Sequence, residues 1–192
     1  LDKNTSGLMA VAKNHKAFLF LKNQFLGRTV SKTYLVLVEG IPAEKEGVIR
    51  FQIRPSRTNR SKKVAVKKMD KSGKKSIRSA ETRYIVKEKI GKFFSLVGAM
   101  PKTGRTHQIR VHLSAIGHPV VGDSLYGAKT RTYADKNADL RGKLPIKRQM
   151  LHAYRIEFTA PNGRRLKLEA PMPEDMKQVI YRLGEIKIAP MN

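Results

Sequence analysis

The feature that most constrains this fold is a buried strand followed at once by a short helix with a polar start. Residues 93–100 are apolar except for one serine, which predicts a buried strand. In the stretch 103–123 that follows, apolar residues at i, i+4 and i+7 share one helical face: Ile109, Leu113 and Ile116. The pattern predicts a sheet with a helix packed against it.

This helix is predicted to begin and end at definite residues. Thr106 can cap its start by accepting a backbone N–H bond, and Gly117 followed by Pro119 would end it. Five side chains that can donate hydrogen bonds lie at or near the start: Arg105, His107, Gln108, Arg110 and His112. Beside a helix N-terminus they suit an anionic partner, although a solvated polar face accounts for the spacing equally well.

The strongly positive net charge of the chain indicates a negatively charged partner. Its 192 residues include 40 Lys and Arg but 15 Asp and Glu, a formal net charge of +25. Such an excess costs self-repulsion in the compact state, which a polyanion would offset. Because the charge is spread along the chain, nucleic acid is favoured over a membrane surface. The most basic segment, 54–75, is expected to be a hairpin or loop that contacts phosphates, or else a mobile solvated loop.

Other classes of site find little support in the sequence. The absence of cysteine excludes disulfides and a thiolate zinc site, and the five histidines form no HExxH pair, so we expect no metal. No run approaches the roughly 18 apolar residues of a membrane span, and residues 1–5 have no signal-peptide character. We therefore expect a cytoplasmic protein, and for so charged a surface a monomer.

Periodicity and turn residues predict the other elements. Strands are expected at 8–12, 33–39, 49–53, 64–66, 81–90, 156–158 and 166–168, the last two joined by a hairpin. Helices are expected at 15–26, capped by Asn14, and at 173–184, with a helical turn at 137–140. No repeat or internal boundary stands out, so the chain is expected to form one mixed domain, mostly sheet.

Residue identity adds a family resemblance. The blocks that carry it are LDKNTSGL (1–8), KTY (32–34), TGRTHQIRVHL (103–113), GHP (117–119), GD (122–123), YG (126–127), LHA (151–153) and APMP (170–173). In this order the chain closely resembles the RluA-type family of RNA pseudouridine synthases over essentially its whole length. Within that family it looks most like the ribosomal large-subunit enzymes.

The resemblance implies an α+β fold in which a few helices flank a mixed, mostly antiparallel central sheet. It also implies an enzyme without metal or cofactor that breaks the N1–C1′ bond of uridine in RNA and rejoins ribose to C5. The catalytic carboxylate would be Asp2, Tyr34 would pack on the target base or transfer a proton, and Arg110 would pair with the carboxylate. A guanidinium in bidentate reach keeps a buried carboxylate ionised. RNA contacts are expected from Lys32, Arg105, His107 and Gln108.

Some positions are expected to serve the fold instead. Asp123 and His152 match family positions and should hold loops and strands together through hydrogen bonds. The family has His-Arg before its Leu-Asp pair, and that arginine helps to displace the target base, whereas this sequence begins at Leu1. We expect residues 1–192 to be a single catalytic domain that lacks the family's first strands and any N-terminal S4-type RNA-binding domain.

Two functions compete on sequence grounds. The first is a pseudouridine synthase, most plausibly for large-subunit ribosomal RNA, and the second is a non-catalytic basic RNA-binding or ribosome-assembly protein, which the net charge fits well. The joint presence of Asp2, Tyr34 and Arg110 favours the enzyme, because a pure binder has no chemical need for them in these contexts. Which uridine is modified, and whether the intermediate is covalent or glycal-like, stays open.

Overall fold

One eight-stranded sheet runs through the protein. The computed structural model describes residues 1–67, 76–127 and 146–184. Its strands are β1 Ser6–Gly7, β2 Ser31–Glu39, β3 Glu46–Pro55, β4 Lys63–Val66, β5 Arg78–Ile90, β6 Phe94–Pro101, β7 Leu151–Thr159 and β8 Arg165–Glu169. They lie in the order β1-β7-β2-β6-β5-β3-β4, with β8 also paired to β7, and every pairing except β1–β7 is antiparallel. The expected α+β fold with a mostly antiparallel sheet is confirmed.

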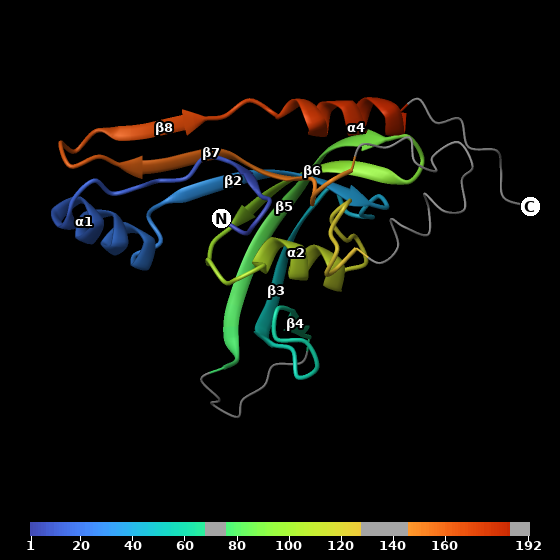
Figure 1. The fold of residues 1–192 in the computed structure, drawn as a ribbon, viewed down its shortest axis with the longest axis horizontal. Coiled ribbons are helices and arrows are strands. Elements are labelled where there is room, and N and C mark those ends of the chain that lie inside the picture. The colour runs from blue at the N-terminus through green and yellow to red at the C-terminus, as the bar shows by residue number, and fades with distance from the viewer. Residues whose placement is uncertain (68–75, 128–145, 185–192) are drawn as a thin grey trace, which may run out of the picture.

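Helices cover both faces of the sheet (Figure 1). The described residues form three of them: α1 His15–Leu26, α2 Gln108–Ala115 and α4 Glu174–Gly184. Side chains alternate across a strand, and β2 makes the two faces clear. Val36 and Val38 pack in the cluster that contains Ile109 and Leu113 of α2, whereas Leu37 packs in the cluster beneath α4. None of the described helices is long and apolar enough to cross a membrane.

Most expected elements are present, often with longer bounds. The Asn14 side chain caps α1 by accepting the Ala17 N–H at 2.9 Å, and 64–66 forms β4, which pairs with β3 in the predicted hairpin. Residues 68–75 of the basic segment and the helical turn expected at 137–140 lie outside the described residues.

Two local predictions are wrong. The strand expected at 8–12 is absent, because β1 ends at Gly7 and the next stretch of the β7 edge, Arg155–Thr159, is already paired with β8. Thr106 does not cap α2: the cap is His107, in a left-handed conformation (φ 58°), without a side-chain cap bond. The Gln108 amide instead holds the loop before the helix, accepting the Arg105 N–H at 3.0 Å.

A buried histidine of α2 makes the stability of the fold depend on pH. His112 is fully buried, its Nδ1 is hydrogen-bonded to Thr82 Oγ1 (2.9 Å), and burial lowers its pKa to about 4, only partly offset by the Phe51 carbonyl. As pH falls below 6.5, His112 takes up a proton in the unfolded chain, but in the folded protein it stays neutral until about pH 4. The free energy of unfolding should therefore decrease as pH is lowered from 6.5 to 4, by up to about 3 kcal/mol from this one group.

Urea unfolding at pH 7.0, 5.5 and 4.5 measures this dependence. His112→Gln has no proton to gain, so its unfolding free energy should fall less steeply than that of the wild type over the same interval. Equal pH slopes for the two proteins would show that His112 does not carry the effect.

Candidate functional site

A pocket of about 360 Å³ opens beside the start of α2. It is walled by the first residues of the chain, by β2 and β7, and by the loop that precedes α2. All seven side chains predicted for the site line it: Asp2, Lys32, Tyr34, Arg105, His107, Gln108 and Arg110. Residues more than 100 positions apart in the sequence thus meet in one cavity, in the lower part of the volume range of small-molecule sites.

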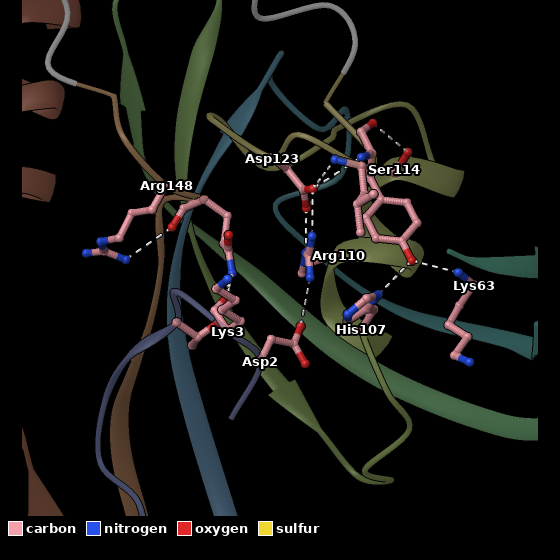
Figure 2. Close-up of polar contacts among 12 residues, drawn as sticks. Asp2, Lys3, Lys63, His107, Arg110, Ser114, Asp123 and Arg148 are labelled. Atoms are coloured by element: carbon pink, nitrogen blue, oxygen red, sulfur yellow. Dashed lines mark hydrogen bonds and ion pairs between the residues drawn. The ribbon is translucent and has the colours of Figure 1, made fainter. Parts of the chain in front are cut away.

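Arg110 lies between two carboxylates at this pocket (Figure 2). Its Nε and Nη2 donate to the two oxygens of Asp123, at 2.6 and 2.8 Å, and its Nη1 donates to Asp2 at 3.2 Å. Burial alone would lower the pKa of Arg110, but the bonds and charges of Asp123 and Asp2 outweigh it and raise that pKa. The predicted pairing with Asp2 is present, while the bidentate partner is Asp123.

Asp123 fixes this arginine through the loop after α2. The side chain of Asp123 is fully buried, and its Oδ1 also accepts the backbone N–H groups of Leu125 and Tyr126 at 3.0 and 3.2 Å. Both oxygens are therefore occupied by the protein itself. Asp2 is different, because its side chain keeps 21% of its exposure and receives one bond from Arg110. Of the two carboxylates, only Asp2 also lines the pocket.

A tight turn presents Asp2 to the pocket. The Thr5 N–H donates to the Asp2 carbonyl at 3.0 Å, and Asn4 takes a left-handed conformation (φ 69°) inside the turn. The buried Gln149 donates from Nε2 to the Lys3 carbonyl at 2.6 Å. This glutamine precedes β7, so the turn is fixed to the sheet.

Arg148 joins the same turn to α4. Its Nε and Nη2 donate to the carboxylate of Asp175 in α4 at 2.7 and 2.9 Å, and its Nη1 reaches the Asn4 carbonyl at 3.4 Å. The hydrogen bonds from Arg148 lower the pKa of Asp175, so the ion pair persists at neutral pH. Figure 2 shows Arg148 and Lys3 on the side of Asp2 away from His107.

The parallel pairing of β1 with β7 completes the anchorage. Ser6 Oγ is hydrogen-bonded to Nδ1 of the buried His152 (2.9 Å), whose Nε2 is bonded to the Ala170 carbonyl (3.1 Å). Gly7 has a positive φ of 108°, and a Cβ there would lie 2.3 Å from the Ala153 carbonyl oxygen. His152 thus has the structural role expected for it, and Gly7 permits a backbone contact that no side chain allows.

Gly7→Ala should therefore loosen the segment that carries Asp2. We expect it to lower the free energy of unfolding by at least about 3 kcal/mol. The new methyl group would clash with the Ala153 carbonyl, and that backbone group cannot move without breaking the β1–β7 pairing. Gly163→Ala is the matched control, because Gly163 also has a positive φ (81°) but nothing within 4 Å of its Cβ position. That variant should cost only about 1–2 kcal/mol from conformational strain. Equal losses in urea unfolding would contradict the role of the close contact.

His107 is held by Tyr126 on the opposite side of the pocket. The Lys63 N–H donates to the Tyr126 hydroxyl at 2.8 Å, and the same hydroxyl lies 2.9 Å from His107 Nδ1 (Figure 2). The hydroxyl oxygen has a second lone pair, so the proton of the Tyr126–His107 hydrogen bond lies on either partner, according to which tautomer the neutral His107 adopts. Burial and the charge of Arg110 lower the pKa of His107, which favours this neutral form. His107 thus presents a neutral imidazole at the pocket.

Gln108 is buried and its amide is fully used within the protein. Its Oε1 accepts from Thr103 Oγ1 (2.7 Å) and from the Arg105 N–H, while its Nε2 donates to the Glu81 carbonyl and to Thr82 Oγ1, both at 2.9 Å. This network ties the loop before α2 to β5. Gln108 lines the pocket, but its geometry favours positioning the loop over contacting a ligand.

Two β2 residues on the same face complete the pocket wall. Tyr34 and Lys32 are both partly buried; burial raises the pKa of Tyr34, as does the charge of Asp2, and burial lowers the pKa of Lys32. The phenol therefore stays neutral, next to a carboxylate and an amine. In the described part of the chain, no group of three or more His, Cys, Asp and Glu could hold a metal ion.

The family model described as RNA pseudouridylate synthase matches residues 1–115. This chain belongs to that family. The chain is 42% identical, over 97% of its length, to ribosomal large subunit pseudouridine synthase D of Nitrosomonas europaea, and 39% identical, over 96%, to an uncharacterised RNA pseudouridine synthase of Chlorobaculum parvum. Among solved structures it is similar to human RNA pseudouridylate synthase domain containing 4 (27% identity, TM-score 0.75), covering 95% of this chain and 73% of that one.

The sequence covers part of such proteins. The chain spans about half the length of the curated relatives it matches: 50% of the Nitrosomonas protein and 57% of the Chlorobaculum protein. The comparisons confirm the resemblance to RNA pseudouridine synthases, and the solved structure shows that the fold is shared as well.

Sequence reasoning missed several residues that hold this pocket together. Tyr126 lay in a recognised block but had no assigned role, and its position between His107 and Lys63 depends on long-range packing. Arg148 ends the least periodic part of the sequence, 128–148, and Gln149 follows it, so no local pattern marks either residue. Their signal was the neighbouring LHA block, which places them just before β7.

Proposed function

We propose that this protein isomerises specific uridines to pseudouridine in RNA, with large-subunit ribosomal RNA as its substrate. One observation carries the proposal: a partly exposed carboxylate, Asp2, lines a pocket and is bonded to a buried arginine whose other carboxylate partner is fully used. The net charge of +25 supports a polyanionic substrate. The Nitrosomonas relative's name supports the large ribosomal subunit.

Asp2 is proposed to act at C1′ of the ribose. As the N1–C1′ bond breaks, the ribose carbon becomes electron-poor, and a carboxylate can bond to it or stabilise its charge. The bonding pair stays with uracil at N1, the freed uracil turns, and C5 attacks C1′ as any bond from Asp2 to C1′ breaks. The proton on C5 then leaves to solvent or to a neighbouring base, and N1 takes up a proton. Arg110 aims Asp2 at the pocket through its Nη1 bond and keeps a positive charge beside it, since its guanidinium cannot lose its proton.

Tyr34 is proposed to pack on the target base. Its pKa is raised by burial and by Asp2, so the phenol carries its proton at neutral pH and is a poor acceptor for the proton on C5. A flat neutral ring in the pocket wall suits stacking against uracil. The packing role is thus favoured over proton transfer.

The uridine must leave its stack before Asp2 can reach C1′. Extrusion costs a few kcal/mol, offset by phosphate contacts and by stacking inside the pocket. Lys32 and Arg105 are the proposed phosphate contacts, and His107 is the proposed hydrogen-bonding contact. Because ribosomal RNA is the proposed substrate and the surface is strongly basic, we propose a cytoplasmic monomer.

Release of tritium tests the reaction itself. Large-subunit RNA transcribed with [5-³H]uridine loses its label wherever C5 becomes bonded to ribose, because the C5 hydrogen must depart. We expect release that saturates at a small number of uridines per RNA. RNA binding without any release would instead support the alternative, a non-catalytic RNA-binding or ribosome-assembly protein, which the basic composition also fits.

A further inference from the structure

A second cavity of about 350 Å³ lies between α1 and the loop that precedes α2. Its lining includes five cationic side chains and one aromatic, and we call it the basic groove: Lys22, Phe25, Arg28, Lys32, Lys102 and Arg105. The rest of the lining is Leu26, Val30, Thr103 and Gly104, so no carboxylate among the described residues lines the groove. Nothing in the proposed chemistry at Asp2 requires it.

Most cations of the basic groove form no ion pair with a described carboxylate. Among the described residues no carboxylate pairs with Lys22, Arg28 or Lys32. Lys102 is shared with Glu81 at 3.6 Å, and Arg105 donates from Nε to the Ser79 carbonyl at 3.1 Å. Burial lowers the pKa of Lys32, so an anion beside it would relieve an unfavourable charge.

The aromatic member is exposed on a helix that is firmly held. Phe25 keeps 45% of its exposure, and α1 buries no residue. The helix is nevertheless fixed beside the sheet (Figure 1), because the Gln24 amide forms two bonds with the backbone of Thr159, at 2.9 and 2.8 Å. The Lys32 ammonium lies 5.7 Å from the centroid of the Phe25 ring. A cation and a stacking surface are thus presented together without ordering cost.

The basic groove adjoins the pocket of Asp2. Lys32, Thr103, Gly104 and Arg105 line both cavities. Gly104 has no side chain at this shared wall, and the atom nearest to its Cβ position is Lys32 Nζ at 4.0 Å. Neighbouring nucleotides of one strand can therefore occupy the two cavities.

We propose that the basic groove binds the single-stranded nucleotide next to the isomerised uridine. Its phosphate lies between Lys32 and Arg105 at the shared boundary, and its base stacks on Phe25. Charge complementarity favours RNA, and an exposed aromatic beside cations is the arrangement that recognises unpaired bases whatever their sequence. This inference rests on the proposed function, because the groove is assigned to the nucleotide that adjoins the extruded uridine and is itself unstacked.

Equilibrium binding tests the groove without requiring turnover. In the Asp2→Asn background, fluorescence anisotropy would follow a labelled ten-nucleotide oligouridylate and a ten-base-pair RNA duplex. Phe25→Ala should weaken binding of the oligouridylate about tenfold and change duplex binding less than twofold, because paired bases offer no face for stacking. Phe25→Tyr, which keeps the ring, should restore binding, and Arg28→Gln should lower the salt slope by about 0.7.

Phe18→Ala is the matched control. Phe18 lies on the same helix, is 51% exposed, and has the ammonium of Lys22, a residue of the basic groove, 5.9 Å from its ring. Phe18 itself lies two turns from Phe25 and does not line the groove. Because its loss leaves both Lys22 and the Phe25 ring in place, it should change neither affinity. Equal effects of the two substitutions, or equal weakening of single strand and duplex by Phe25→Ala, would overturn the proposal.

The two proposals fail separately. If the wild type forms no pseudouridine but Phe25→Ala still loses single-strand affinity, the groove stands as an RNA site and only the proposed reaction is wrong. If the wild type forms pseudouridine and Phe25→Ala binds and reacts normally, the groove inference is wrong and the reaction stands.

Discussion

Asp2→Asn should abolish pseudouridine formation while leaving RNA binding nearly unchanged. Asparagine keeps the shape of the side chain, and its amide oxygen can still accept from Arg110 Nη1, but it can neither attack C1′ nor balance positive charge there. We expect single-turnover rates on large-subunit RNA to fall on the order of 10⁴-fold or more. Filter binding of the same RNA should change less than threefold.

Folding does not confound this variant. The side chain of Asp2 is partly exposed, and the turn that carries it is held by the Thr5 backbone N–H and the Gln149 side-chain amide, which donate to the Asp2 and Lys3 carbonyls. Thermal unfolding of Asp2→Asn should match the wild type closely. A variant that folds, binds and still reacts within tenfold of the wild-type rate would remove Asp2 from the chemistry.

Arg110→Ala should damage both turnover and the fold. Loss of the guanidinium removes the hydrogen bond that aims Asp2 and the positive charge beside it, and we expect the single-turnover rate to fall roughly 10²–10³-fold. It also leaves the buried Asp123 carboxylate without its bidentate partner, which should cost about 3–5 kcal/mol of stability. Affinity for RNA should change much less than turnover, because Arg110 is only 5% exposed at its side chain.

Two further variants separate these effects. Arg110→Lys keeps a positive charge, but an ammonium cannot make the bidentate bond to Asp123 and reach Asp2 as well. This variant should be more stable than Arg110→Ala and still slow in turnover. Arg105→Ala removes a half-buried arginine from the same pocket without touching Asp2 or Asp123. It should weaken RNA affinity and leave the rate at saturating RNA nearly intact. Near-normal turnover by Arg110→Ala, measured below its unfolding temperature, would contradict the account.

Local patterns in the sequence predicted what depends on neighbouring residues. The nearly continuous apolar run of β2, the alternation of β3, the Asn14 cap and the apolar face of α2 each follow from patterns within a dozen residues. Asp2, Tyr34 and Arg110 were found through recognised blocks, because their spacing alone carries no sign that they meet. The structure then brought all three to one cavity.

What could not be predicted depends on long-range competition. Residues 8–12 have the composition of a strand, but β8 takes the β7 edge that they would need. Thr106 is a better cap than histidine by type, yet the Gln108 amide binds the loop at Arg105 and β5 at Glu81, and His107 becomes the cap residue. Arg148 and Gln149 matter because they reach a turn about 145 positions away, and no local pattern encodes such a contact.

Mapping of pseudouridine on unmodified large-subunit RNA tests the central claim most directly. After treatment with carbodiimide, primer extension stops at pseudouridines, so the wild-type protein and Asp2→Asn can be compared on the same RNA. The account predicts new stops at a few uridines with the wild type and none with the variant. Tight RNA binding by both proteins with no new stop from either would contradict it, and would identify a binding protein instead of an enzyme.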